Sequence, residues 1–263
     1  MPQRVLVLVT GASKGIGRAI AGLLREKGYA VLGTSRNPEG IADRIEGVEY
    51  LALDLRSPAS IEAVVQKAGP VDVLINNAGG SQVWPAADTP LSKVRDLFEA
   101  NFFGQIALIQ GLLPGMIARG SGLIINVGSM TGKFAVPFQS GYSSSKSALA
   151  GYTWSLRNEV RAFGLDAVML EPGHIRTGIT PEVFAAPGSR FTPQLETVAR
   201  RRAALVGGGS DPSVVARKAL KIIRSGRRRP FYAAGGKAPL MVFARRLLTN
   251  RAVERLMRKM YGF

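Results

Sequence analysis

The sequence predicts an α/β fold, with a doubly wound parallel sheet of about seven strands flanked by helices and followed by a C-terminal helical extension. Two observations predict it. Short apolar runs alternate with helical stretches along the chain. The 263 residues are 46% hydrophobic and 20% charged, which suits a globular chain with a large core. No internal repeat divides residues 1–263, so we expect a single domain.

Seven segments have the character of buried strands. They lie near Val5, Ala30, Val48, Val71, Leu123, Ala167 and Pro230. Helical periodicity between these segments predicts helices on both faces of the sheet.

The first apolar run, Val5–Val9, leads directly into a glycine-rich turn at residues 10–17. A helix is expected from Arg18 to Lys27. Glycines at 11, 15 and 17 let backbone N–H groups and the helix N-terminus approach a pyrophosphate without a Cβ in the way. Although the spacing is GxxxGxG and not GxGxxG, the strand–turn–helix context predicts a Rossmann-type dinucleotide site over an ordinary turn.

The second strand ends at Ser35 and Arg36, where an acidic side chain would bind the ribose 2′-hydroxyl of NAD. A guanidinium can instead bind the 2′-phosphate of NADP, and Lys14 can approach the same group from the glycine turn. We therefore expect NADP(H). The alternative is that Arg36 and Lys14 are solvated surface charges.

Tyr142 and Lys146 are four residues apart, and Ser129 lies thirteen residues upstream of the tyrosine. Helical i, i+4 spacing places an ammonium near the phenol. A free tyrosine has a pKa of about 10, and a nearby positive charge should lower it towards the range useful in acid/base catalysis. An exposed helix pair would have the same spacing.

Together these residues resemble the classical short-chain dehydrogenase/reductase family, in order from about Val5 to Thr177. Further matching motifs follow predicted strands or lie on predicted helices. They are Asp54 after the strand Val48–Leu53, Asn76-Asn77-Ala78-Gly79 after the strand Val71–Ile75, Asn101, and Pro172-Gly173-His174-Ile175-Arg176-Thr177.

The resemblance implies a set of cofactor-binding residues. They are Gly11, Ser13, Lys14, Gly15, Ile16, Gly17, Ser35, Arg36, Asp54, Leu55, Asn77, Ala78, Gly79, Tyr142, Lys146, Pro172, Gly173, Ile175 and Thr177. By resemblance, Asp54 contacts the adenine amino group, although it could instead cap its loop. The segment 77–79 packs against the adenosine ribose, or forms only a structural turn. Residues 172–177 surround the nicotinamide.

The resemblance also implies the catalytic roles. Tyr142 donates a proton to the carbonyl oxygen, or acts as base in alcohol oxidation, and Ser129 hydrogen-bonds the same oxygen. Lys146 orients the nicotinamide ribose and lowers the Tyr142 pKa. Asn101 holds a water in a proton relay, unless it is a buried asparagine satisfied by a backbone carbonyl. His174 is expected to be an ordinary loop side chain.

Residues 178–206, which include Val183, Phe184 and Phe191, should cover the substrate in this family. Their apolar content suggests a lipophilic carbonyl or alcohol substrate that is steroid-, retinoid- or acyl-like, although core packing would give similar content. A 3-oxoacyl-(carrier protein or CoA) reductase is the alternative. Many of these enzymes end soon after an Asp-Gly-Gly element, whereas here Ala234-Gly235-Gly236 lacks the aspartate and 27 residues follow. A homo-oligomer, dimer or tetramer, is expected, with the usual tetramer in doubt.

The net charge of +17 is concentrated in the C-terminal third, where residues 176–263 hold 19 basic and four acidic side chains. Contact with an anionic membrane or an acidic protein would suit this charge, and solvated helix faces would also explain it. Nucleic-acid binding is disfavoured, because no aromatic residues interleave with the basic ones.

Residues 237–263 form a basic, amphipathic extension that we expect to lie outside the catalytic machinery. Thr249-Asn250 offers an N-cap that divides the extension into two short helices. These helices could pack on the body, close over the substrate, join a dimer or lie on an anionic membrane.

The remaining composition narrows the function classes. With no cysteine and a lone histidine, the chain offers neither a disulfide nor an evident metal site, so none is expected. We see no apolar run near the roughly 18 residues that span a bilayer, and expect a cytoplasmic location. A non-catalytic NADP(H)-sensing regulatory protein and a basic scaffold are alternatives. The intact Asn101, Ser129, Tyr142 and Lys146 set argues against a sensor.

Overall fold

The computed structural model describes residues 4–178 and 180–263. It confirms the predicted fold class: seven parallel strands form one sheet, in the order β3-β2-β1-β4-β6-β7-β9. The strands are β1 (Leu6–Val9), β2 (Ala30–Ser35), β3 (Glu49–Ala52), β4 (Val73–Asn76), β6 (Gly122–Val127), β7 (Leu165–Pro172) and β9 (Phe231–Ala234).

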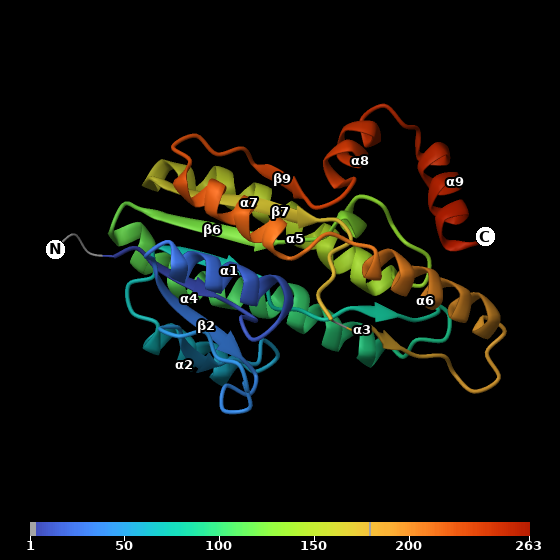
Figure 1. Ribbon diagram of the computed structural model, residues 1–263, viewed down its shortest axis with the longest axis horizontal. Helices are drawn as coiled ribbons and strands as arrows, with labels where there is room; N and C mark the ends of the chain where they lie inside the picture. Colours follow the sequence, from blue (N-terminus) through green and yellow to red (C-terminus); the bar gives the residue numbers. More distant parts are fainter. Residues whose placement is uncertain (1–3, 179) are drawn as a thin grey trace.

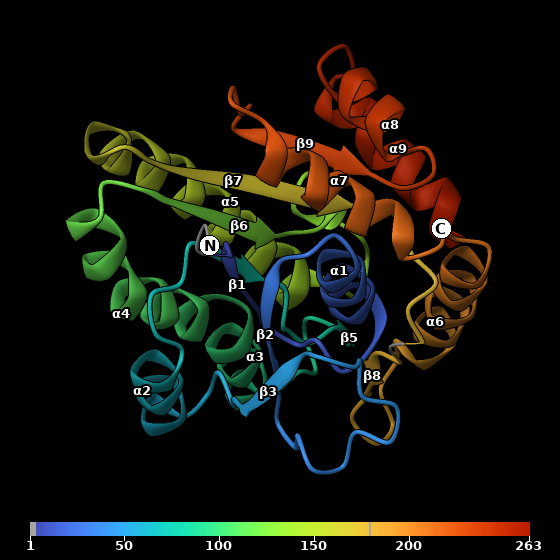
Figure 2. The same ribbon diagram turned by 60° about the vertical axis from the view of Figure 1, so that its left-hand side comes forward.

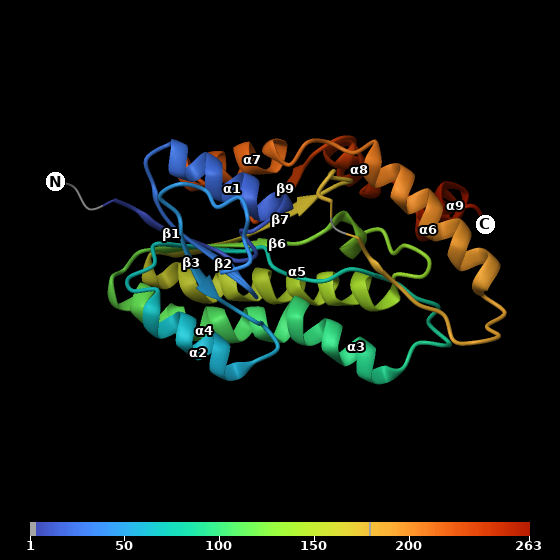
Figure 3. The same cartoon turned by 60° about the horizontal axis from the view of Figure 1, so that its bottom comes forward.

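Helices cover both faces of this sheet, and further helices gather at one end of the molecule. The helices are α1 (Gly15–Glu26), α2 (Pro58–Lys67), α3 (Leu91–Phe98), α4 (Gly104–Ala118), α5 (Ser140–Val160), α6 (Thr192–Gly207), α7 (Ser213–Arg224), α8 (Ala238–Arg245) and α9 (Asn250–Tyr261). A π-helical turn, Glu99–Phe103, joins α3 to α4, and 3₁₀ turns occupy Met130–Gly132 and Arg161–Phe163. Figure 3 shows α1 and α7 on one side of the sheet and α2, α4 and α5 on the other.

Alternation along the strands divides the core into two layers. Val7 and Val9 of β1 belong to the cluster under α1 and α7, whereas Leu8 belongs to the cluster under α2, α4 and α5. Strands buried on both faces need continuous apolar runs, which is why these strands were visible in the sequence. After β3 the chain returns to the middle of the sheet and continues with β4, so the strand order reverses between the neighbouring strands β1 and β4. In folds of this type the carboxyl ends at that point form the ligand crevice.

The C-terminal helices build a third core cluster, at the end of the molecule where α6, α8 and α9 gather (Figures 1 and 2). On α9, Val253, Met257 and Tyr261 are buried, and α9 packs on α6. The side chain of Thr249 accepts a hydrogen bond from the Ala252 backbone N–H, as the predicted N-cap requires.

A small second sheet lies beside this cluster. It pairs β5 (Gln82–Val83) with β8 (Glu182–Val183) in parallel. We did not predict it, because strands of two residues carry no periodicity. The pairing joins the loop after β4 to the segment 178–206, whose residue 179 lies outside the described residues.

Among the described residues, one helical stretch, Leu91–Ala118, is long and apolar enough to cross a membrane by length and composition alone. This corrects the expectation that no apolar run approaches such a length. In the fold, Leu108, Ile109 and Met116 of this stretch are fully buried in the second core layer. Packing against the sheet therefore explains why part of this stretch is apolar.

Candidate active site

A cavity of about 940 Å³ lies along the carboxyl ends of the strands. Its wall contains every residue predicted for the site except Gly15, Gly17 and Asn101. Lys14 and Arg36 lie in the glycine-turn half, and Ser129, Tyr142 and Lys146 lie in the other half. The structure thus brings the predicted cofactor and catalytic residues to one site.

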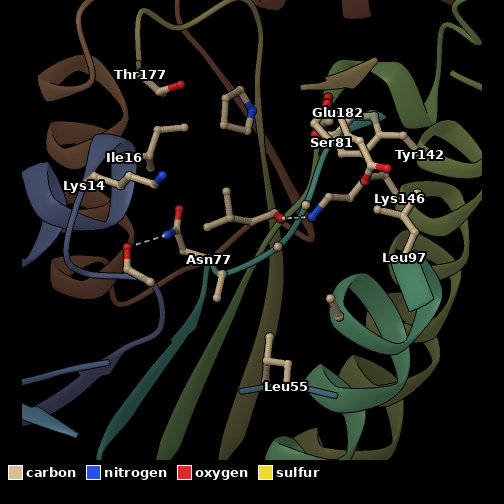
Figure 4. Close-up of a pocket in the computed structure, with 18 of the residues that line it drawn as sticks. Lys14, Ile16, Leu55, Asn77, Ser81, Leu97, Tyr142, Lys146, Thr177 and Glu182 are labelled. Atoms are coloured by element: carbon tan, nitrogen blue, oxygen red, sulfur yellow. Dashed lines mark hydrogen bonds between the residues drawn. The ribbon is translucent and has the colours of Figure 1, made fainter. Parts of the chain in front are cut away.

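Gly15 and Gly17 do not line the cavity, but they determine the shape of the glycine turn. A Cβ on Gly17 would come 2.2 Å from the Gly11 carbonyl oxygen and 2.5 Å from Asn77 Nδ2, so only glycine fits there. Gly11 and Gly15 adopt positive φ values of 68° and 57°, which favour glycine. Asn77 Nδ2 donates to the Thr10 carbonyl at 2.9 Å and to the Gly11 carbonyl at 3.4 Å, and the second bond is marked in Figure 4. These bonds fix the turn against the end of β4.

Helix α1 begins at Gly15, directly beneath this turn, and presents an N-terminus suited to an anion. Its N-cap, Lys14, makes no side-chain capping bond, and the first turn holds no acidic residue. The partial positive charge of the helix N-terminus therefore faces the cavity without an internal counter-charge.

The end of β2 has the chemistry expected for a 2′-phosphate. Arg36 and Lys14 both line the cavity, and neither forms an ion pair with any described residue. Asp43 lines an adjoining hollow, but its carboxylate is paired with Arg18. Glu39, the acidic residue that follows Arg36 most closely in sequence, is likewise paired with Arg44 at 3.2 Å.

The contacts of Asp54 are those of a residue that caps its own loop, which was the alternative to adenine binding. Its two carboxylate oxygens accept from Arg56 Nε at 3.1 Å and Nη2 at 2.8 Å, and Oδ1 also accepts from the Arg56 backbone N–H at 3.0 Å. The side-chain bond to Arg56 lowers the pKa of the Asp54 carboxyl. Asp54 therefore caps its own loop, and contact with an adenine stays a prediction. Arg56, which sequence reasoning missed, lines the cavity here.

Lys146 lies one helical turn after Tyr142 on α5, as the spacing predicts. It is only 4% exposed, and its Nζ donates to the Val127 carbonyl at 3.1 Å (Figure 4). Burial lowers the pKa of the Lys146 ammonium to about 8. A lysine near its pKa at working pH can exchange protons readily.

The expectation that Lys146 lowers the Tyr142 pKa is wrong. Burial raises the pKa of the Tyr142 phenol, against opposing effects from a hydrogen bond with Ser129 and from the charge of Arg202. Partial removal of the phenol from water disfavours the phenolate. Tyr142 is therefore held protonated at neutral pH, which suits a proton donor.

Ser129 follows β6 and begins the 3₁₀ turn Met130–Gly132. Its Oγ accepts from Thr131 Oγ1 at 2.8 Å and from the Thr131 backbone N–H at 3.2 Å. The turn thus fixes Ser129 in the cavity wall together with Tyr142.

Asn101 stands in the π-helical turn and is fully buried behind the cavity wall. Its Oδ1 accepts from Gly80 N–H at 2.8 Å, and its Nδ2 donates to the Gly80 carbonyl at 3.1 Å and to Ser145 Oγ at 3.2 Å. The side chain ties the loop after β4 to α5. The Asn101 amide is thus hydrogen-bonded within the protein, as expected for a buried asparagine with a backbone carbonyl as partner. A proton relay through a water held by Asn101 stays a prediction.

The loop after β7 closes the end of the cavity that is predicted to hold the nicotinamide. Pro172, Gly173, Ile175 and Thr177 line it, and Gly173 N–H donates to the Ala234 carbonyl at 2.9 Å. His174 lines the same wall. Burial, followed by the charge of Arg202, lowers the pKa of His174, so its imidazole is neutral at neutral pH.

The C-terminal extension contributes to the wall of the same cavity, and the expectation that it lies outside the catalytic machinery stays a prediction. Tyr261, on the last turn of α9, is 2% exposed to solvent and lines the wall with Tyr142. The spacing of Val253, Met257 and Tyr261 on one helix face was the available signal. That face packs on the body because it is apolar.

The segment 178–206 also differs from expectation. Val183 and Phe191 are 51% and 40% exposed and, with Phe184, are not among the cavity-lining residues. Glu182, Arg202 and Val206 line it instead. Arg202, expected only as part of a basic run, is the residue here that sequence reasoning missed. Among the described residues, no cluster of three or more His, Cys, Asp or Glu side chains could hold a metal.

Comparison with known proteins places this geometry in a known group. The family model for short chain dehydrogenase matches residues 5–188. The chain is 32% identical over 238 residues to the dehydrogenase/reductase SDR family member 7B of Danio rerio, covering 84% of this chain and 74% of the relative.

Two solved structures have the same fold. A short-chain dehydrogenase from Streptomyces avermitilis superposes with a TM-score of 0.80 at 31% identity, covering 98% of this chain and 99% of the other. A single-residue variant of actinorhodin polyketide ketoreductase, solved with NADPH, superposes with a TM-score of 0.72 at 28% identity, covering 85% of this chain and 91% of the other.

Proposed function

The chain belongs to the short-chain dehydrogenase/reductase family of oxidoreductases, and from this premise we propose that it interconverts a carbonyl compound and an alcohol with NADP(H). The observation that carries the proposal is a phenol, Tyr142, held protonated in one cavity with Ser129, Lys146 and the glycine turn. Proton-transfer groups at the open end of a dinucleotide crevice suit hydride-transfer chemistry.

The residues present fit a dinucleotide. Gly17 leaves no room for a Cβ beneath the turn, and the N-terminus of α1 is open to a pyrophosphate. Arg36 and Lys14 would hold a 2′-phosphate, since neither forms an ion pair with a described residue. The NADPH in the similar ketoreductase structure agrees with this choice. When bound, the nicotinamide supplies or accepts a hydride.

The side chains of this protein would manage the charge that this transfer creates. In the reducing direction, negative charge builds on the substrate oxygen as its carbon gains hydride. Tyr142 gives its phenolic proton to that oxygen, while the Ser129 hydroxyl donates a hydrogen bond that holds it in place. Lys146 would bind the ribose hydroxyls and return a proton towards Tyr142. In the oxidising direction, Tyr142 would first give its own proton to neutral Lys146, whose pKa is lowered to about 8, and the phenolate would then accept the alcohol proton.

We propose a substrate with a lipophilic part. Trp84, Leu97 and Val206 supply apolar surface in the cavity wall, and residues 178–206 would cover the bound substrate. A steroid-, retinoid- or acyl-like carbonyl compound suits this surface. A 3-oxoacyl thioester is the alternative, favoured by the likeness to a polyketide ketoreductase.

A panel of carbonyl compounds tests this proposal. Purified protein is mixed with NADPH or NADH and with medium-chain ketones, steroids, retinal and 3-oxoacyl thioesters, and the loss of nicotinamide absorbance is followed. The proposal expects turnover with NADPH for some members. Tight NADPH binding with no turnover of any substrate, in either direction, would support the non-catalytic sensor.

Three further properties belong to the proposal. We propose a homo-oligomer, a cytoplasmic location, and contact of the basic C-terminus with an anionic membrane or acidic protein. Leu240, Phe243 and Leu247 of the α8 region are 65%, 60% and 76% exposed among basic side chains, which suits such a contact. Mass determination in solution tests the homo-oligomer, and flotation with anionic liposomes tests the contact of the basic C-terminus with a membrane.

A further inference from the structure

We propose that Arg202 forms an anion-binding subsite in the substrate half of the cavity, and that the carbonyl substrate therefore carries a carboxylate or phosphate group. The inference rests on the proposed function, because it names the substrate class of the same site. It requires that Arg202 face the cavity, that its charge be unpaired there, and that no other task account for it.

Arg202 projects from α6 into the wall that also holds Tyr142 and Tyr261. Its Nη2 donates to Ser81 Oγ at 3.0 Å. Ser81 lies on the same side of the cavity as Tyr142 (Figure 4) and follows Gly80, which Asn101 holds in place. The guanidinium is thus fixed at a defined position by one of its donors.

No described carboxylate lies within ion-pair distance of Arg202. The acid that lines the cavity from β8, Glu182, is paired with Lys93 at 2.5 Å. Asp54 is paired with Arg56 at 2.8 Å, in the cofactor half of the cavity. Arg202 is half-buried, and this burial lowers the pKa of its guanidinium. A cation partly withdrawn from water is normally paired, and among the described residues this one has no counter-ion.

The free donors of Arg202 match a planar or tetrahedral anion. Within the described residues, Nη2 makes the hydrogen bond to Ser81, and Nε and Nη1 donate to no protein group. A guanidinium with two free donors can bind carboxylate or phosphate oxygens in a forked geometry. Tyr261, buried nearby, offers a phenolic hydroxyl as a further donor.

Two other tasks for Arg202 fit the structure less well. The helix contact between α6 and α9 is secured by the neighbouring Arg201, which donates to the Lys259 carbonyl at 3.2 Å and to the Met260 carbonyl at 3.4 Å. The cofactor phosphates would lie at the glycine turn and Arg36. The charge of Arg202 instead acts on Tyr142 and His174, at the reacting end of the cavity. A substrate anion is the group left to meet it.

The test compares matched substrates that differ only in charge. A series of keto acids with one to five carbons between ketone and carboxylate is assayed with NADPH, each against its methyl ester. A phosphorylated hydroxyketone is assayed against the same hydroxyketone without its phosphate. The variants are Arg202→Ala and Arg202→Lys, with Arg200→Ala as control. Arg200 is exposed on the same helix and lines no part of the cavity.

We expect the wild type to favour at least one anionic substrate over its neutral partner in kcat/KM. In Arg202→Ala this ratio should fall by about ten- to a hundredfold, the usual effect of losing a charged hydrogen bond. Arg202→Lys should retain part of it, and Arg200→Ala should keep the wild-type ratio. The phosphate and carboxylate arms tell which anion is preferred. Turnover of neutral ketones without preference for any acid, or an unchanged ratio in Arg202→Ala, would overturn the subsite and leave the proposed function standing.

A binding measurement separates the subsite from the proposed function. Hexanoate and phenyl phosphate, which carry no ketone, are titrated into wild type and Arg202→Ala in the presence of NADP⁺, with calorimetric detection. Binding that weakens at least tenfold in Arg202→Ala supports the subsite even if no ketone in the panel is reduced, in which case the proposed reductase activity fails alone. If both proteins bind these probes equally, or neither binds them, the subsite is refuted whatever the turnover. Melting temperatures of the variants show whether they are folded.

Discussion

At the scale of single residues, the site combines groups that the sequence reveals with electrostatics that it does not. The glycine turn and the Tyr142/Lys146 pair follow from local spacing, because each motif occupies one turn or one helix face. The raised pKa of Tyr142 depends on burial by segments far away in the sequence, and so does the exposure of Arg202 to the cavity. Local patterns contain no information on such burial.

Lys146 gives a prediction that links activity to stability. Its pKa is depressed from 10.5 to about 8, so the folded protein bears a cost of about 3 kcal/mol for the buried charge below pH 8. Lys146→Met should therefore raise the free energy of unfolding at pH 7 by about 1–3 kcal/mol, less the lost bond to Val127, while turnover falls sharply.

The sign follows from proton linkage. Between pH 8 and 10.5 the unfolded chain binds a proton at Lys146 that the folded chain does not, so the wild type gains stability as pH rises. The advantage of Lys146→Met should shrink over this window in urea titrations. Lys67→Met, at an exposed position on α2, serves as control. An advantage that grows above pH 8 would contradict the account.

Arg36 gives a prediction about cofactor choice. Arg36→Ala should weaken NADPH binding by about ten- to a hundredfold and leave NADH binding nearly unchanged, because only NADPH carries the 2′-phosphate. Fluorescence titration with both cofactors measures this difference. Arg44→Ala is a matched control, since Arg44 pairs with Glu39 and lies outside the cavity wall. Equal losses for both cofactors in Arg36→Ala would exclude the phosphate contact.

At the scale of elements, the strands were predictable and the C-terminal helices only in part. The N-cap at Thr249 and the two helices follow from local sequence. The place of α9 against α6, with Tyr261 in the cavity wall, does not, because an amphipathic helix can bury its apolar face against several surfaces. The two-residue strands β5 and β8 likewise form only because the tertiary fold brings them together.

The packing of α9 can be tested with two adjacent residues. Met257 is 4% exposed in the third core cluster, and its neighbour Leu256 is 39% exposed. Met257→Ala should lower the free energy of unfolding by about 2–5 kcal/mol, and should reduce activity by loosening Tyr261. Leu256→Ala should change the stability by less than about 0.5 kcal/mol. Urea denaturation compares the two, and similar losses for both would show that α9 does not pack as described.

At the scale of the whole molecule, one cavity joins three distant parts of the chain. The glycine turn supplies its cofactor half, α5 supplies the proton-transfer groups, and α6 and α9 supply Arg202 and Tyr261. The glycine turn and α5 lie within residues 5–188, which the family model matches. Helices α6 and α9 lie beyond these residues. Sequence reasoning from a family resemblance therefore predicted the glycine turn and the proton-transfer residues of the cavity wall, and missed Arg202 and Tyr261. From the sequence, the basic residues of the C-terminal third were expected on solvated helix faces or at contacts with partners. One of them, Arg202, lies in the cavity wall instead.

We propose above all that this molecule is an NADPH-dependent carbonyl reductase in which Tyr142 donates the proton. The most direct test is kcat of Tyr142→Phe beside NADPH affinity, with Tyr152→Phe, on the same helix but outside the cavity wall, as control. We expect Tyr142→Phe to lose about 10²- to 10⁴-fold in turnover, to bind NADPH within a few fold of wild type, and Tyr152→Phe to remain active. Turnover by Tyr142→Phe at more than half the wild-type rate at the same pH would contradict the account.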